Sequence, residues 1–97
     1  MDELQFEWDS RKEKTNIKKH GISFDEASTA FYDENAIEFF DPDHSENEDR
    51  FILLGINIKL RVVVVCHCWR KSETVIRIFS ARKADIDETN EYWRLRK

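Results

Sequence analysis

Glycine and proline are scarce in this chain, which has only two glycines and one proline among 97 residues. Gly21 and Gly55 stand far apart, so the sequence has no glycine-rich loop of the kind that holds phosphates. It also has no Gly-x-Ser-x-Gly motif, which excludes the nucleophile elbow of the α/β-hydrolases. Long apolar runs are missing, and the first residues lack the basic and then apolar pattern of a signal peptide. We therefore expect a cytoplasmic location and no membrane segment.

Cysteine is also rare, and the only two, Cys66 and Cys68, lie two positions apart in a predicted strand. Neighbouring positions on one face of a strand suit a disulfide poorly, so the pair fits a reducing compartment. The triplet Cys66-His67-Cys68 invites a zinc site, but alternation along a strand points the histidine away from the two cysteines. His44 is the other nearby candidate, and it lies in a loop that we expect to be mobile. We expect neither a metal nor another cofactor.

The chain is not basic: its formal net charge is −4, although 37% of its residues are charged. This balance argues against broad binding to duplex DNA, whose affinity comes from many neutralised phosphates, but it allows a small local basic site. The length fits one small domain over residues 1–97. With 40% hydrophobic residues, including seven phenylalanines and three tryptophans, the chain can build one compact core.

The richest β-forming stretch is residues 60–82, in which two β-branched runs flank a polar break. Val, Ile and aromatic side chains suit a pleated surface better than a helix. The pattern predicts a β-hairpin at the centre of one antiparallel sheet, with Lys71-Ser72-Glu73 as its connection. If three residues make the connection, Arg70 faces Thr74 and His67 faces Arg77. The even-numbered face then forms the helix-covered core, and a slip of one residue would undo this pairing.

The remaining elements follow from caps and periodicity. Gly21 is placed to end a charged helix, and Ser23 with Glu26 forms a capping-box pattern that starts the next one. An acidic loop at residues 41–49 separates two further strands. The predicted order is β-α-α-β-β-β-β-α, an α+β domain whose antiparallel sheet has four to five strands, with two N-terminal helices and one C-terminal helix. The expected elements are a strand at 6–8, helices from 10–20 and from 23, strands at 36–40 and 50–56, the hairpin, and a helix at 84–97.

Several short motifs occur in a characteristic order along almost the whole chain. They are Phe6-x-Trp8-Asp9, Lys19-His20-Gly21, Glu48-x-Arg50-Phe51 and Arg77-Ile78-x-Ser80-Ala81-Arg82-x-Ala84. With these motifs the sequence resembles the BrnT family of type II toxins, small ribonucleases related in fold to the RelE group. The resemblance implies a RelE-like toxin that cleaves RNA without a metal, inhibits translation and is neutralised by a BrnA-type antitoxin.

The same resemblance implies how the chain meets DNA. The antitoxin would carry a ribbon-helix-helix part, so the toxin would contact DNA only through its partner, and the complex would repress its own operon. It also implies a toxin dimer bridged by an antitoxin dimer. The negative net charge agrees with indirect DNA contact.

A metal-free ribonuclease needs a base, an acid and a fixed cation near the scissile phosphate. For catalysis we expect His20 and Glu48 as proton carriers and Arg77 and Arg82 on the phosphate, because an arginine fork can donate two parallel hydrogen bonds. For RNA binding, the expected residues are Trp8, Lys19, Arg50, His67 and Ser80.

Each of these residues also has a structural interpretation. Arg82 can pair with Glu88 or Asp85, and Arg77 can form a buried pair with a carboxylate. Arg50 and Glu48 can form an ion pair at the start of a strand.

For the other candidates, His20 can simply complement the C-terminal end of a helix, and His67 can pack and hydrogen-bond within the sheet. Trp8 can belong to the core. A second function also stays open: a binding module or co-repressor without strong catalysis, because the acidic loop at 41–49 would repel RNA unless it faces away from the site.

Overall fold

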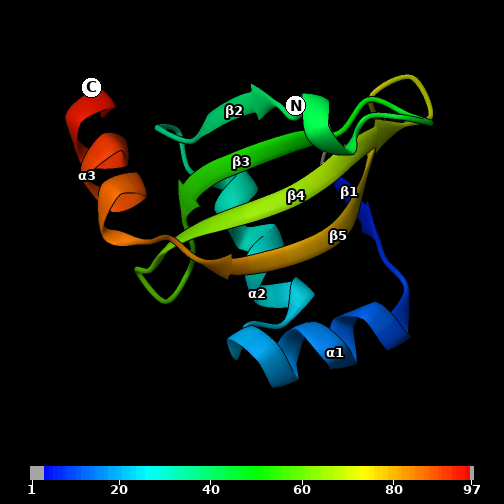
Figure 1. Cartoon of the computed structure of the whole chain (residues 1–97), viewed down its shortest axis with the longest axis horizontal. Coiled ribbons are helices and arrows are strands. Elements are labelled where there is room, and N and C mark those ends of the chain that lie inside the picture. The colour runs from blue at the N-terminus through cyan, green and yellow to red at the C-terminus, as the bar shows by residue number, and fades with distance from the viewer. Residues whose placement is uncertain (1–3, 97) are drawn as a thin grey trace.

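A five-stranded sheet forms the centre of the computed structural model, which describes residues 4–96 (Figure 1). Its strand order is β1-β5-β4-β3-β2. All neighbouring strands are antiparallel except β1 and β5, which pair in parallel. The α+β class and the order of elements are therefore confirmed. The elements are β1 (Gln5–Glu7), α1 (Ser10–His20), α2 (Phe24–Ser28), β2 (Ile37–Phe40), β3 (Phe51–Ile56), β4 (Val62–Arg70), β5 (Val75–Lys83) and α3 (Ile86–Leu95), with 3₁₀ turns at Thr29–Tyr32 and Pro42–His44.

Helix α1 has the predicted bounds because both of its ends are capped locally. The Asp9 carboxylate accepts a hydrogen bond from the Arg11 backbone at 2.8 Å, and Gly21 takes the left-handed conformation with φ 69°. In the middle of the helix, the buried Asn16 amide donates to the carbonyls of Ile22 and Ala81, at 2.9 and 2.8 Å, and accepts from the Ala81 N–H. Asn16 thus fixes α1 beside the second half of β5.

Helix α2 begins at the predicted cap, where Ser23 Oγ accepts a hydrogen bond from the Glu26 N–H. The second half of the predicted capping box is absent, because the buried Glu26 carboxylate turns elsewhere. It accepts a hydrogen bond from Asn57 Nδ2 at 2.6 Å and pairs with Lys59 Nζ at 3.3 Å. At α3 the full capping box forms between Asp85 and Glu88.

Both faces of the sheet are covered, and this corrects the prediction that even-numbered positions alone form the helix-covered core. The odd-numbered Val63 and Val65 of β4 pack with Phe24 of α2. On the opposite face, Tyr92 of α3 packs against a smaller cluster that includes Val62 and Val64. Helix α3 lies at one end of the sheet (Figure 1), so part of this second face is left free for a site.

The hairpin register differs from the prediction by one residue. The turn spans four residues, 71–74, and its first three have positive φ angles. A β-bulge interrupts the ladder between Cys66 and His67, and it leaves Phe79 as an extra residue in β5. Arg77 and Arg82 therefore share one face of the sheet in spite of their odd and even numbers, while His67 lies on the other. Observed partners are Arg70 with Val75, Cys68 with Arg77, His67 with Ile78, Cys66 with Ser80 and Val64 with Arg82.

Candidate active site

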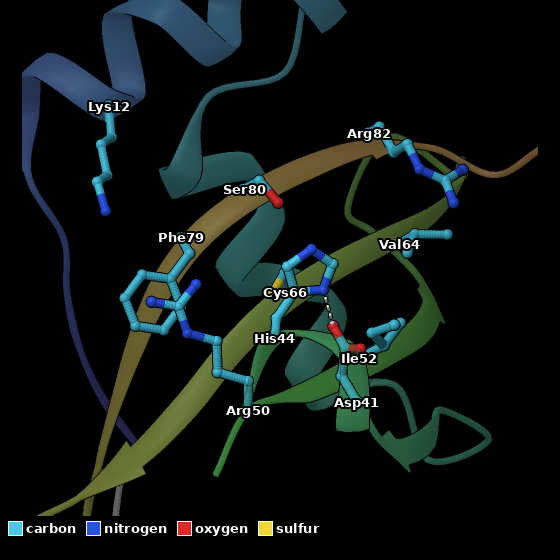
Figure 2. A pocket seen from close by; sticks show the side chains of 10 residues that line it. All are labelled: Lys12, Asp41, His44, Arg50, Ile52, Val64, Cys66, Phe79, Ser80 and Arg82. Carbon is cyan, nitrogen blue, oxygen red and sulfur yellow. Dashed lines mark hydrogen bonds and ion pairs between the residues drawn. The ribbon is translucent and has the colours of Figure 1, made fainter. Parts of the chain in front are cut away.

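The uncovered part of the second face is a cleft of about 400 Å³ between α1, β5 and the loop before β3 (Figure 2). Ile52, Val64 and Cys66 supply its apolar lining from β3 and β4. The polar and aromatic side chains around it are Lys12, Asp41, His44, Arg50, Phe79, Ser80 and Arg82. Residues from five distant parts of the sequence therefore meet in one hollow.

A second hollow of about 340 Å³ adjoins the first and shares Lys12, Phe79 and Ser80 with it. It adds Lys19 and His20 from the end of α1. We call the two hollows together the basic groove. Among residues 4–96, five of the residues that line it are cationic (Arg11, Lys12, Lys19, Arg50 and Arg82), and one, Asp41, is a carboxylate. A chain with net charge −4 thus concentrates positive charge along this surface.

The acidic loop turns most of its carboxylates away from the basic groove. Asp43, Glu46 and Glu48 line a neighbouring hollow instead, which shares His44 and Arg50 with the groove. The acidic loop at residues 41–49 therefore repels RNA less at the groove than its sequence alone suggested.

Arg50 is held in the groove by an aromatic ring. Its guanidinium carbon lies 3.8 Å from the centre of the Phe79 ring, and Lys12 Nζ lies 5.2 Å from the same centre. The expected strand-start pair also exists, but Arg50 Nη2 and Glu48 Oε1 are 3.9 Å apart. The Phe79 ring and, at the limit of ion-pair distance, Glu48 therefore both restrain this guanidinium.

Arg82 forms an ion pair with Glu88, which is the structural role that the sequence allowed for it. Its Nη1 and Nη2 donate to the two carboxylate oxygens of Glu88 at 2.8 and 2.9 Å. These hydrogen bonds raise the pKa of Arg82 and lower the pKa of Glu88. The Arg82 side chain is 43% exposed and lines the groove, so its charge is fixed there by α3.

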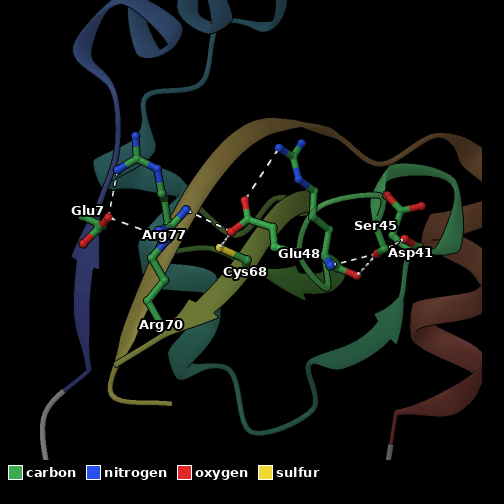
Figure 3. A network of polar contacts seen from close by, with 8 residues as sticks. Glu7, Asp41, Ser45, Glu48, Cys68, Arg70 and Arg77 are labelled. Carbon is green, nitrogen blue, oxygen red and sulfur yellow. Dashed lines mark hydrogen bonds and ion pairs between the residues drawn. The ribbon is translucent and has the colours of Figure 1, made fainter. Parts of the chain in front are cut away.

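Arg77 and Glu48 belong to a second polar network beside the groove (Figure 3). Arg77 Nη1 donates to Glu7 Oε2 at 2.8 Å, and Arg70 Nη2 donates to Glu48 Oε2 at 3.0 Å. Cys68 Sγ lies 3.7 Å from the same Glu48 oxygen. The carboxylate partner considered for Arg77 is therefore Glu7, and neither Arg77 nor Glu48 lines the basic groove.

His67 lies outside the groove, on the face covered by α2, and its side chain is 0% exposed. Its Nε2 lies 2.6 Å from Glu38 Oε2 and its Nδ1 lies 3.0 Å from the Val65 carbonyl, while the ring packs on Phe31. The predicted RNA contact and the predicted pairing with Arg77 are both incompatible with this position. His67 pairs with Ile78 because the hairpin turn has four residues, and it is buried because α2 and the 3₁₀ turn at Thr29–Tyr32 cover this face of the sheet.

The same geometry separates the three members of the Cys66-His67-Cys68 triplet. Their side chains do not converge, because His67 points away from the face of the two cysteines. Between residues 4 and 96, no group of three His, Cys, Asp or Glu side chains is arranged to hold a metal ion. Burial raises the pKa of the thiols of both Cys66 and Cys68.

The remaining expected RNA-binding residues fall into two groups. Lys19 and Ser80 line the groove and are exposed, as is the expected proton carrier His20. Trp8 instead packs edge-to-face on Phe24, with ring centres 5.9 Å apart, beside the core under α2. Its position matches the core interpretation.

His44 was not among the expected site residues, yet it lines the groove beside Asp41. Its Nδ1 lies 2.8 Å from Asp41 Oδ2 (Figure 2). A signal was present in Asp41-Pro42-Asp43-His44: a proline near the start of a short helix places side chains three apart on one side. The expectation of a mobile loop hid this pairing.

Comparison with known proteins gives one family and one fold. The family described as "Ribonuclease toxin, BrnT, of type II toxin-antitoxin system" matches residues 8–88. A crystal structure of the Brucella abortus ribonuclease toxin BrnT is similar, with a TM-score of 0.64 and 24% identity over 86% of this chain and 99% of that one. At this identity the likeness shows the fold alone. No curated protein matches the chain, and none of the helices within residues 4–96 is long and apolar enough to cross a membrane.

Proposed function

The chain belongs to the BrnT family of ribonuclease toxins of type II toxin–antitoxin systems, and we propose that it cleaves RNA in the basic groove without a metal ion. The observation that carries this proposal is the convergence of Lys19, Arg50 and Arg82 on one surface that also contains His20. A single RNA strand crossing the groove would meet cations along its phosphates and the Phe79 ring for stacking.

The chemistry assigned to the groove uses these groups directly. Arg82 and Arg50 bind phosphate oxygens and stabilise the charge that develops as the bond to phosphorus forms. His20 carries a proton to or from the reacting oxygens. Arg82 keeps a hydrogen-bond partner in Glu88, so phosphate binding requires that Arg82 share its donors between the two anions.

Glu48 and Arg77 act in this proposal as positioning residues. Their network with Glu7 and Arg70 holds the Glu48 carboxylate 3.9 Å from Arg50 Nη2. Loss of the Glu48 or the Arg77 side chain would then act indirectly, by shifting Arg50, and not directly on the reacting atoms. Lys19 and Ser80 contact the RNA backbone at the other end of the groove.

In this proposal no metal ion is needed, because side chains supply both the proton transfer and the positive charge at the phosphate. The test is cleavage of RNA by the purified chain in the presence of EDTA. Activity in EDTA within about twofold of the untreated rate supports the proposal, while loss of activity that Mg²⁺ or Zn²⁺ restores would reject it.

The cognate antitoxin that a type II toxin implies is, in this proposal, a BrnA-type protein with a ribbon-helix-helix part. The toxin would reach DNA only through it, as two toxin copies bridged by an antitoxin dimer, and would act on RNA in the cytoplasm to inhibit translation. The support is electrostatic: a net charge of −4 disfavours direct DNA binding, while one local groove suits RNA. Gel shifts of operator DNA with toxin, antitoxin and both together test it.

Growth of cells that express the chain alone tests the ribonuclease function. We expect arrest by the wild type and relief by His20→Ala combined with Arg82→Ala. Two variants serve as controls. Lys18→Ala removes an exposed α1 lysine outside the groove, and Arg94→Ala breaks a surface pair with Glu91 like the one that Arg82→Ala breaks. Harmless accumulation of the wild-type chain without its antitoxin would reject the proposal.

One observation favours a second function, that of a co-repressor with little catalysis. Both arginines expected on the phosphate are already engaged, Arg82 by Glu88 and Arg77 by Glu7. A chain that binds its antitoxin and strengthens operator binding, but leaves RNA intact at all concentrations tested, would support this alternative.

A further inference from the structure

His44 presents one ring nitrogen to Asp41 and leaves the other for the groove. The Nδ1–Oδ2 distance of 2.8 Å is that of a charge-assisted hydrogen bond. Asp41 is 7% exposed and His44 is 65% exposed at its side chain, so a buried carboxylate carries an accessible imidazole. Figure 2 shows the ring among the side chains that line the cleft, joined to the Asp41 carboxylate. Within residues 4–96 no hydrogen bond occupies its Nε2.

Hydrogen bonds with the backbone of Arg50, the residue directly before β3, fix the position of the His44–Asp41 pair. The Asp41 N–H donates to the Arg50 carbonyl at 2.8 Å, and the Arg50 N–H donates to Ser45 Oγ at 2.9 Å. Ser45 Oγ in turn donates to the Asp41 carbonyl at 2.5 Å. Two of these hydrogen bonds therefore tie the segment that carries His44 to Arg50, whose guanidinium lines the same cleft, and the third holds the segment together.

This geometry suits a general base. When Asp41 accepts from Nδ1–H, the neutral ring offers the Nε2 lone pair to the groove, and the carboxylate stabilises the imidazolium that forms. Lys12, Arg50 and Arg82 line the same hollow and can hold the phosphate next to it. Catalytic proton carriers are recognised first by such geometry.

We propose that His44 is a catalytic residue of the ribonuclease reaction, with Asp41 as its positioning residue; the proposal rests on the function proposed above. Nε2 of His44 takes the proton of the 2′-hydroxyl, and the 2′-oxygen forms a bond to phosphorus. The bond from phosphorus to the 5′-oxygen breaks, and that oxygen receives a proton from His20. The products are a 2′,3′-cyclic phosphate and a 5′-hydroxyl, with no change in oxidation state.

The test compares single-turnover cleavage of a defined RNA by the full wild-type chain, His44→Ala and His44→Gln. We expect both variants to cleave about 100-fold more slowly or worse, the usual loss for a proton carrier. Binding of the same RNA with a 2′-deoxy group at the cleavage site should change by less than about threefold, since His44 acts on the proton and not on the phosphate. Added imidazole should speed His44→Ala but not Lys19→Ala.

Asp41→Asn tests the positioning role by separating kcat from KM. We expect a lower kcat at an unchanged KM, while the matched control Asp43→Asn, on the same 3₁₀ turn, keeps wild-type values. Circular dichroism confirms that each variant is folded.

The outcomes separate the two proposals. A wild-type chain that does not cleave RNA would overturn both of them. A cleaving wild type with His44→Ala and His44→Gln within about threefold of it would overturn only the role of His44. Loss of RNA binding in parallel with cleavage would also overturn it, because His44 would then be a binding residue.

Discussion

Tyr92→Phe is expected to destabilise the fold by removing one oxygen atom from the contact that docks α3. Tyr92 is 0% exposed, and its hydroxyl donates to Asp33 Oδ2 at 2.5 Å. The same carboxylate accepts from the backbone N–H groups of Ile56 and Asn35, at 2.9 Å each. One carboxylate thus joins α3 to β3 and to the turn before β2.

The magnitude follows from what the substitution leaves in place. The aromatic ring stays in its cluster with Val62 and Val64, so no large cavity opens. A hydrogen bond to a charged group is worth about 1.5–3 kcal/mol, and Asp33 keeps two donors, so we expect a loss of about 2 kcal/mol. In a domain of this size that lowers Tm by about 8–16 °C.

The loss of stability in Tyr92→Phe should depend on pH, because folding shifts the pKa values of Asp33 and Tyr92 in opposite directions. Burial opposes the ionisation of Asp33, but hydrogen bonds from Tyr92 and Ile56 outweigh it and lower its pKa below the ordinary 3.8. A folded pKa below the unfolded one stabilises the protein above the unfolded value, and this contribution is lost as pH falls through the folded pKa. Burial, with the bond to Asp33, raises the pKa of Tyr92 to about 12. That contribution is complete below the ordinary 10.0 and is lost as pH rises toward 12.

Urea unfolding of wild type, Tyr92→Phe and Tyr32→Phe measures these effects. Tyr32 is 57% exposed, so its hydroxyl lies in water and its loss should cost little. The gap between wild type and Tyr92→Phe should be widest between about pH 5 and 9 and should narrow outside that range. A loss below about 0.5 kcal/mol for Tyr92→Phe, or an equal loss for Tyr32→Phe, would refute the reasoning.

Three further results are expected. Asn16→Ala should lower the free energy of unfolding in urea by about 2–4 kcal/mol, because buried backbone groups of β5 and of the turn after α1 lose their hydrogen-bond partner. The control Lys18→Ala on the same helix should change it very little. Gly21→Ala should lower the stability by about 1 kcal/mol in thermal unfolding, since the φ of 69° strains any residue with a Cβ. Cys66 should react with iodoacetamide more slowly than a free cysteine at pH 8 in a Cys68→Ser chain, because burial raises its thiol pKa; an equal rate would contradict this.

Local patterns predicted the parts of the fold that local hydrogen bonds control. The bounds of α1, its Gly21 cap and the Ser23 cap of α2 all depend on groups a few residues apart, so each could be read from neighbouring letters. The hairpin between β4 and β5 was predicted for a similar reason, because β-branched runs around a polar turn favour it.

The local sequence pattern could not predict on which face of the sheet a given side chain lies. The four-residue turn and the bulge at Phe79 each shift the register by one, and together they place Arg77 and Arg82 on one face. His67 lies on the other face, where the helical segments packed on the sheet bury it. A bulge is stabilised by the strands and helices packed around it, which no short window of sequence contains.

The sequence by itself determined the class of fold, the family motifs and several groove residues, notably His20, Lys19, Arg50, Ser80 and Arg82, because motif and cap signals are local. Only the tertiary structure decided that these residues form one surface, that Arg77 and Glu48 lie in a neighbouring network, and that His44 joins Asp41 in the cleft. The physical reason is that the groove is built by packing: α1 is fixed to β5 through Asn16, and the acidic loop is fixed to the start of β3 through Ser45.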